Sequence, residues 1–228
     1  MQQAKNLSEY NKELREALDN TFLRGAMEKF ATAYPVGRAN ALRDYDVDAL
    51  IAEVVNTKNA GLGCLDQLYA DFKAAAEAKG VKVHLAKDAA EANEIIARIA
   101  KDAHCKKIVK SKSMTAEETL LNHRLEKDGL EVTETDLGEW IIQLRKEGPS
   151  HMVMPAIHLS RYQVAELFSQ VTREDQSTDI QRLVKVARRE LRQKYAEADM
   201  GISGANFSSR SEERRVGKEC KSRWSPYH

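Results

Sequence analysis

The sequence has few cysteines, no long apolar run and no signal-peptide core, and each absence excludes a class of protein. Its three cysteines, Cys64, Cys105 and Cys220, are far apart and none belongs to a C-x-x-C pair. They predict neither a disulfide scaffold nor, by themselves, a cysteine-ligated metal cluster in this chain. No apolar run approaches the length of a membrane span, and the N-terminus lacks the apolar core of a signal peptide. We therefore expect a cytoplasmic protein without a transmembrane segment.

The chain also lacks an excess of charge of either sign. It has 36 Lys and Arg residues against 35 Asp and Glu residues, a formal net charge of +1. A charge this small provides no global field to recruit nucleic acid or an anionic membrane, so we expect no nucleic-acid partner. The length of 228 residues allows one large domain or two small ones.

The last residues differ in character from everything before them. Residues 210–228, RSEERRVGKECKSRWSPYH, combine six basic and three acidic residues with no helical or strand period. They resemble translated sequencing-adapter DNA, and we interpret residues 208–228 as a non-native tail that is left out of fold reasoning. The alternative is a genuine basic tail that binds acidic partners. Under the first interpretation the native sequence stops near Phe207, inside a longer protein.

The first 80 residues carry a helical pattern and little chemistry. Apolar side chains recur at spacings of three and four from about residue 7, which predicts a helix that ends before Pro35. A second helix is expected from near Asp46 or Asp48, and a third over about residues 65–79. We interpret residues 1–80 as an N-terminal helical region in which the Tyr and Phe side chains belong to the core.

Residues 81–207 alternate short apolar runs with helical patterns, which is typical of βαβ units around a parallel sheet. The expected strands are residues 81–85, 108–109, 130–135 and 152–154. The expected helices begin at Asp88, Thr115, Ser160 and Thr178, each followed three residues later by Glu or Gln as in a capping box. The predicted fold class is α/β, with a helical N-terminal layer and a partial parallel sheet over residues 81–207.

Two stretches leave more than one structure open. Residues 137–144 fit either a short helix or a strand, and helix is slightly preferred. Residues 200–207 follow the last helix as a glycine-spaced turn, which normally feeds a strand, and that strand is missing. We therefore expect a truncated sheet with an open edge, and poor solubility of residues 1–207 expressed alone.

Ligands of such sheets bind beyond the carboxyl ends of the strands. Lys110, Ser111, Lys112 and Ser113 follow one expected strand and precede a helix, where lysines, hydroxyls and free N–H groups favour a small anionic substrate. The stretch is not a Walker loop, because the GxxxxGK[ST] pattern is absent. The alternative is a solvated lysine turn whose serines cap the helix.

Acidic residues and a histidine follow the next two expected strands. Glu134, Asp136 and Glu139 can serve as general bases, general acids or metal ligands. Asp136 is equally well placed to cap a helix, with Glu139 in its first turn. His158 is placed for proton transfer or for a structural hydrogen bond, while His151 lies at the other end of its strand, so the two are not expected to chelate one metal.

Several motifs agree, in order, with one known family. The stretches KSKSMTAEE, LN.RLE..G, ETDLGEWIIQL, PSHMVMPAIH and ADMGISGANF resemble the LUD-domain proteins, and within them the lactate utilization protein B family. The resemblance covers essentially residues 1–207 as an N-terminal fragment. It implies a fold similar to the NagB/RpiA/CoA-transferase-like class. The family positions carried over are Lys110, Ser111, Lys112, Ser113, Glu134, Asp136, Gly138, Glu139, His158 and Asn206.

The resemblance also implies a function. Members of the family are iron–sulfur subunits that work with sister subunits in an NAD-independent L-lactate dehydrogenase-type complex, which oxidises L-lactate to pyruvate. Their [4Fe–4S] clusters are held by C-x-x-C-x-x-C-x-x-x-C runs, and this sequence contains no such run. We therefore expect the cluster ligands to be absent here, no metal site in this chain, and a fragment that is inactive alone. Glu134, Asp136 and His158 are the catalytic candidates, and Lys110–Ser113 with Asn206 the candidates for binding substrate.

Two other functions stay open. The wider fold also suggests a transferase or isomerase acting on a CoA ester or a sugar phosphate, although a fold does not determine an activity. A non-catalytic LUD scaffold that only docks partners is the third possibility. Turnover of acyl or phosphate esters without iron would favour the transferase, and tolerance of alanine at every strand-end position would favour the scaffold.

Overall fold

The computed structural model describes residues 6–205, 207–208 and 215–216. The chain divides into two compact units, one formed by residues 1–30 and 87–204 and the other by residues 31–86 and 205–228. We call the first the α/β unit and the second the helical unit. The predicted boundaries at residues 80 and 207 stay a prediction.

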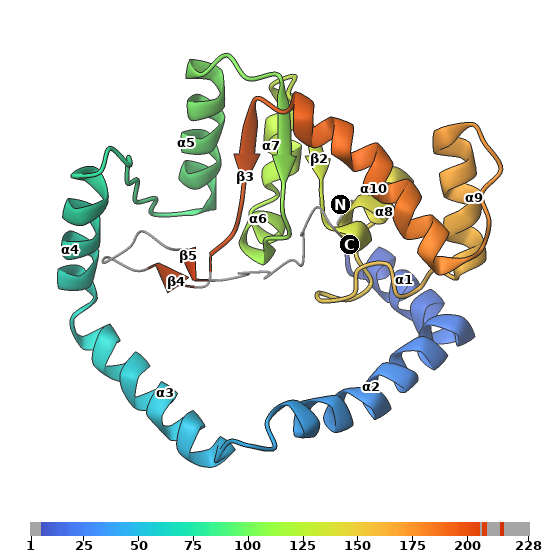
Figure 1. The fold of residues 1–228 in the computed structure, drawn as a ribbon, viewed down its shortest axis with the longest axis horizontal. Coiled ribbons are helices and arrows are strands. Elements are labelled where there is room, and N and C mark those ends of the chain that lie inside the picture. The colour runs from blue at the N-terminus through green and yellow to red at the C-terminus, as the bar shows by residue number, and fades with distance from the viewer. Residues whose placement is uncertain (1–5, 206, 209–214, 217–228) are drawn as a thin grey trace, which may run out of the picture. The chain divides into compact units, whose positions relative to one another are not determined.

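The α/β unit is built around three short parallel strands (Figure 1). Its strands are β1 (Lys107–Lys110), β2 (Glu131–Glu134) and β3 (Met200–Ile202). They lie in the order β2-β1-β3, with Lys110 opposite Glu134 in the register of β1 and β2. The prediction of an α/β fold with a partial parallel sheet is confirmed.

Helices account for most of the α/β unit. They are α1 (Leu7–Asp19), the start of α2 (Thr21–Ala41), α5 (Ala89–Asp102), α6 (Met114–Glu118), α7 (Leu121–Lys127), α8 (Leu137–Arg145), α9 (Arg161–Thr172) and α10 (Ile180–Glu197). The open choice at residues 137–144 is resolved as the helix α8, which begins because the side chain of Asp136 accepts hydrogen bonds from the N–H groups of Gly138 and Glu139. No helix in the described part of the chain is long and apolar enough to cross a membrane.

Two clusters of buried apolar side chains hold the unit together. The first joins α5, α6 and α7 to β1 and β2 through Ala97, Ala100, Cys105, Ile108, Ala116, Leu121, Leu125 and Val132. The second joins α8, α9 and α10 through Trp140, Ile141, Ala165, Leu167, Phe168, Leu183, Ala187 and Leu191. The buried stripe of each helix follows the three-to-four spacing that the sequence shows, because those positions share one helix face.

The sequence missed the strand β3. Residues 200–202 were expected to form a turn that precedes a missing strand, but they are themselves a strand, paired with β1. Asp199 fixes its start, since its carboxylate accepts from the N–H groups of Lys106 and Lys107 at 2.8 and 2.9 Å. A three-residue strand with a central glycine has little propensity of its own, so it forms through its neighbour.

Two other predicted strands are wrong. Residues 81–85 form no strand, and Val81 and Leu85 are 43% and 70% exposed, so no sheet buries them. Residues 152–154 form a bend. There the ring of His151 accepts hydrogen bonds from the N–H groups of Val153 and Met154, which removes the donors that a strand would use.

The N-terminal helices also depart from expectation. The predicted single helix is broken into α1 and α2, because the side chain of Asn20 caps α2 at the N–H of Leu23. The helix α2 continues through Pro35 to Ala41, although the predicted helix was expected to end before this proline. The aromatic side chains assigned to a core include Tyr10 and Phe22, which are 53% and 49% exposed.

Helix caps were predicted with mixed success. Ser160 and Gln163 form the expected capping box at the start of α9. The helix α6 is capped by Ser113 rather than Thr115, and α10 by Asp179 rather than Thr178. The observed cap lies two residues before the predicted one in α6 and one residue after it in α10, and in both helices it is a better capping residue than threonine. Differences of one or two residues are normal for predicted helix ends.

The helical unit contains little that is buried. It comprises the later part of α2, α3 (Val47–Gly63), α4 (Leu65–Glu77) and an antiparallel pair, β4 (Phe207–Ser208) with β5 (Arg215–Val216). The predicted break between the second and third helices near residue 63 is confirmed. Ala76 is the buried residue of α4, whereas α3 has none.

Candidate functional site

Polar residues gather where β1, β2 and β3 end, as the sequence predicts for a parallel sheet. Ser111 follows β1 and its N–H donates to the carbonyl of Ile202, the last residue of β3, at 2.9 Å. The Ser111 hydroxyl donates to that of Ser203 at 3.3 Å. A Cβ on Gly204 would lie 3.2 Å from Ser113, so glycine is what allows the β3 loop to approach this closely.

Lys110 is buried although it is a lysine. Its side chain is 1% exposed and its ammonium lies 2.9 Å from Oε1 of Glu134 and 3.4 Å from Oε1 of Glu117. Buried charges of this kind are tolerated when they are paired. Lys110 is therefore committed to internal ion pairs, and the register that places it opposite Glu134 explains why.

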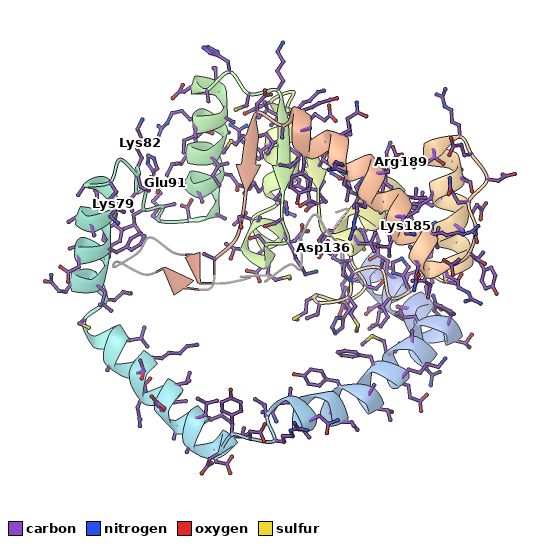
Figure 2. All side chains as sticks on the ribbon, viewed as in Figure 1. Lys79, Lys82, Glu91, Asp136, Lys185 and Arg189 are labelled. Atoms are coloured by element: carbon purple, nitrogen blue, oxygen red, sulfur yellow. The ribbon has the colours of Figure 1, made fainter. Side chains whose placement is uncertain are left out.

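Lys112 makes a second internal ion pair. Its ammonium lies 2.6 Å from the carboxylate of Glu139, a side chain that is 6% exposed. Glu139 belongs to the first turn of α8, directly after the capping residue Asp136, which is labelled in Figure 2. The structure thus gives Asp136 a capping contact and Glu139 a lysine partner, and the role of both in catalysis stays a prediction.

Glu134 is the most strongly constrained carboxylate of the site. Its Oε1 accepts from the amide of Asn122 at 2.5 Å as well as pairing with Lys110. Burial raises the pKa of Glu134 above its ordinary value, and the hydrogen bonds and charge of Lys110 and the bond from Asn122 only partly offset this. A carboxyl with a raised pKa at the end of a strand is a good proton carrier, as expected for a catalytic candidate.

A cavity of about 580 Å³ adjoins Glu134 at the end of β2. It is lined by Ala116, Glu117, Leu120, Asn122, His123, Glu126, Glu134, Glu139, Ile142, Gln143, Lys146, Glu147 and Pro149. Its walls come from α6, α7 and α8, and its size lies within the range of small-molecule sites. The amide of Gln143 completes one wall, since it accepts from the N–H of Glu134 and donates to the carbonyl of Val132, which satisfies the open edge of β2.

His158 lies in the loop between α8 and α9, away from the strand ends. Its Nε2 is 3.1 Å from the carboxylate of Glu147 and its Nδ1 is 2.6 Å from the hydroxyl of Ser150. Arg145 also binds Glu147, and its hydrogen bond, followed by that of His158, holds the pKa of this carboxyl below its ordinary value. His158 thus contacts Glu147, which lines the same cavity as Glu134, and is not itself among the residues that line it.

Not all the predicted residues can be placed. Lys110, Ser111, Ser113, Glu134 and Asp136 lie at the carboxyl ends of the strands, as expected, whereas Asn206 lies outside the described residues. The sequence reasoning missed Asn122, Glu117, Ser150 and Glu147. No local pattern marks Asn122, because neighbouring helix positions point about 100° apart and the burial of Leu121 does not determine the direction of the next side chain.

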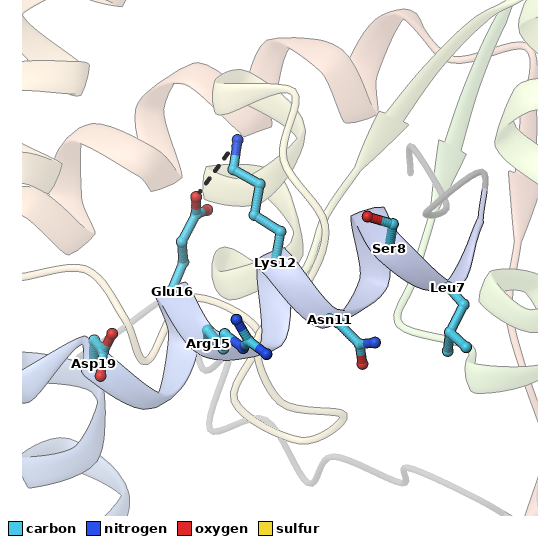
Figure 3. Close-up of a pocket in the computed structure, with 7 residues that line it drawn as sticks. All are labelled: Leu7, Ser8, Asn11, Lys12, Arg15, Glu16 and Asp19. Atoms are coloured by element: carbon cyan, nitrogen blue, oxygen red, sulfur yellow. Dashed lines mark ion pairs between the residues drawn. The ribbon is translucent and has the colours of Figure 1, made fainter.

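A second hollow, of about 560 Å³, lies along α1 (Figure 3). Its seven lining residues all belong to that one helix, and the dashed line marks the exposed ion pair of Lys12 with Glu16. Because no second element of the described chain lines it, this hollow is a helix surface rather than a binding site.

Comparisons with known proteins agree with this picture. The model of the LUD domain matches residues 69–208. Among curated proteins, Lactate utilization protein B of Oceanobacillus iheyensis is 37% identical over 202 residues. The proteins of that name from Bacillus thuringiensis and Bacillus cereus are 33% identical over 202 residues.

The matched segment is 87% of this chain but 42% of each of those three relatives, so the chain spans about two fifths of their length. No solved structure matches. The match to the domain model covers more than half of the sequence, including every strand-end residue described above. The chain belongs to the LUD domain family.

Proposed function

We propose that this chain is the N-terminal part of the iron–sulfur subunit of an L-lactate oxidation complex, which works with sister subunits to convert L-lactate to pyruvate. The observation that carries the proposal is the similarity to proteins named Lactate utilization protein B, at 33–37% identity over 87% of the chain. Because the chain spans 42% of those relatives, the activity is proposed for the whole protein.

The described residues do not fit a [4Fe–4S] cluster. Cys105 is buried in the apolar core beside Ile108, where its thiol is surrounded by hydrocarbon side chains, and Cys64 is an isolated exposed cysteine of the helical unit. No group of three or more potential ligands occurs among the described residues. Electron transfer through clusters is therefore assigned to the part of the protein beyond this segment, and no step here depends on a cluster.

The role proposed for the described part is to hold the substrate. In the strand order β2-β1-β3 the connections reverse direction at β1, and ligands of open α/β sheets bind where such a reversal occurs. Ser111 and Ser203 present hydroxyl groups at this point. We assign the carboxylate of lactate to these hydroxyls and nearby backbone N–H groups, since Lys110 and Lys112 are occupied by glutamates.

The complex itself provides the first test. Reduction of an artificial electron acceptor is measured with L-lactate, using the full-length subunit together with its sister subunits. We expect pyruvate to form only when the subunit that contains this segment is present, and none when the 228-residue chain replaces it. Undiminished L-lactate oxidation without this subunit would refute the proposal.

Substrate binding is tested separately on the same complex. We expect the Ser111→Ala/Ser203→Ala variant to raise KM for L-lactate by about tenfold, because two charge-assisted hydrogen bonds to the carboxylate are lost. Thr115→Ala on the exposed side of α6 is the control and should leave KM unchanged. An unchanged KM in the double variant would mean that these two serines do not hold the substrate.

A further inference from the structure

The cavity beside Glu134 has a chemistry opposite to that of an anion site. Five of its lining residues are glutamates, Glu117, Glu126, Glu134, Glu139 and Glu147, whereas Lys146 is the lysine among them. Lys110, Lys112 and Arg145 form ion pairs with Glu134, Glu139 and Glu147 and are not themselves part of the lining. The lining thus presents five carboxyl groups and one ammonium group, a composition that favours a cationic ligand over an anionic one.

Two oxygens of the cavity residues have no hydrogen-bond partner among the described residues. They are Oε2 of Glu134 and Oδ1 of Asn122, both buried, and both residues line the cavity. Glu134 is 3% exposed, so this carboxylate oxygen is shielded from bulk solvent. A buried acceptor without a partner destabilises the folded state, and the cost is larger when the acceptor is charged. Such a pair of acceptors is best satisfied by a ligand that brings its own donors.

The side chains that carry these two acceptors are in contact. The amide nitrogen of Asn122 donates to Oε1 of Glu134 at 2.5 Å, while Oδ1 of Asn122 and Oε2 of Glu134 have no partner among the described residues. Leu120, Ile142 and Pro149 supply an apolar wall. The cavity therefore contains two unpartnered acceptors on side chains that are hydrogen-bonded to each other. It also contains an apolar surface that suits a short hydrocarbon chain.

We propose that this cavity binds a small organic cation, through a primary ammonium group that donates hydrogen bonds to Oε2 of Glu134 and Oδ1 of Asn122. An ammonium group carries three donors, so it can satisfy both oxygens at once and still reach a third acceptor. A metal ion fits less well, because no group of three or more potential ligands occurs in the described part of the chain. The site does not include Ser111 or Ser203, which follow β1 and β3, and it does not depend on lactate.

A matched series of probes tests the charge of the ligand. The purified 228-residue chain is titrated with n-butylammonium, n-butanol and n-butyrate, which share four carbons and differ in the head group. Binding is followed through the amide and side-chain NMR signals of Asn122 and Glu134. We expect n-butylammonium to have a dissociation constant at least about tenfold below that of n-butyrate, with n-butanol between them.

Variants locate the site. Asn122→Leu keeps the branched shape of the side chain but removes the acceptor Oδ1 together with the donor to Glu134, and we expect about fivefold weaker binding of n-butylammonium. Glu126→Lys changes an exposed residue of the cavity rim and so keeps the fold, and it should weaken n-butylammonium about tenfold while strengthening n-butyrate. Glu118→Lys makes the same charge reversal on α6, outside the cavity lining, and should change neither.

Three results would overturn the proposal. They are equal or tighter binding of n-butanol or n-butyrate, the absence of saturable shifts with any probe, and equal effects of Glu126→Lys and Glu118→Lys. Weaker binding in Glu126→Lys together with unchanged binding in Glu118→Lys supports it, whether or not Asn122→Leu folds. A changed KM for L-lactate in the Ser111→Ala/Ser203→Ala variant would bear on the substrate site alone, so the two proposals fail separately.

Discussion

The helices α3 and α10 begin from the same kind of sequence pattern and end in opposite environments. Both carry apolar residues at helical spacing. In α10 these include Leu183, Ala187 and Leu191, all buried against α8 and α9, whereas α3 has no buried residue. The apolar side chains of α3 are 41–50% exposed at four positions, Leu50, Ile51, Val54 and Val55. Periodicity predicts that a helix forms and which face is apolar, but burial depends on a neighbour that the pattern does not specify.

The same contrast separates the charged residues of the two units. In the α/β unit Lys110 and Glu134 are 1% and 3% exposed, and their register across β1 and β2 brings them together. In the helical unit Lys73 and Glu77 form an ion pair one turn apart on α4, 42% and 48% exposed. The first pair is held in a fixed place by the fold, while the second is solvated and contributes little.

The largest difference should appear when apolar side chains are truncated. Phe168→Ala removes a ring that is 1% exposed and packs on Trp140 with ring centroids 5.3 Å apart. We expect a loss of about 3–5 kcal/mol in the free energy of unfolding. Val54→Ala on α3 should change it by less than about 0.5 kcal/mol. Urea unfolding followed by circular dichroism measures both, and equal losses would mean that α3 is buried in solution.

Ion pairs provide the next comparison. Lys110→Met leaves the buried carboxyl of Glu134 without its closest cation, and we expect a cost of about 3–5 kcal/mol. Burial already raises the pKa of Glu134. Because the folded state therefore keeps the proton to higher pH than the unfolded state, the cost should be largest above the folded pKa and should shrink as pH falls below it.

The matched variant in the helical unit is Lys73→Met. It removes the cation of an exposed pair whose atoms are 3.9 Å apart, and it should change stability by no more than about 0.5 kcal/mol at any pH. Unfolding curves at several pH values decide the comparison. A pH-independent cost in Lys110→Met, or a cost no larger than that of Lys73→Met, would show that the pair is not buried.

Sequence reasoning reached the parts of the fold that local patterns control. The spacing of Ile95, Ile96 and Ile99 predicted α5, and Ile108 with Val109 predicted β1. The sequence-based prediction was wrong where a tertiary contact determines whether a segment forms a strand. Val81–Leu85 has an apolar run but no strand beside it in the described part of the chain, whereas Met200–Ile202 looks like a turn and becomes a strand because β1 pairs with it.

The site was predicted in position but not in chemistry. The rule that ligands bind at the carboxyl ends of parallel strands led to Lys110, Ser111 and Glu134, which the structure does bring to one edge. The sequence suggested that the lysines are available to an anion. Their pairing with glutamates 24 and 27 residues later depends on strand register and on the placement of α8, and no local pattern reports either.

A smaller effect is expected from Glu147, which is half-exposed and holds the loop between α8 and α9. The hydrogen bond from Arg145, and then that from His158, keeps the pKa of Glu147 below its ordinary value near 4.5. A carboxyl whose pKa is lower in the folded state stabilises the fold above its unfolded pKa, and this stabilisation is lost as pH falls through the folded pKa. The free energy of unfolding of Glu147→Gln should therefore lie below that of the parent at neutral pH and converge with it in acid.

Glu53→Gln, on the exposed surface of α3, is the control, and its curve should follow the parent throughout. If Glu147→Gln also follows the parent at every pH, the Arg145–Glu147–His158 network does not hold the loop, and the difference between the two units is then confined to the sheet and its packed helices.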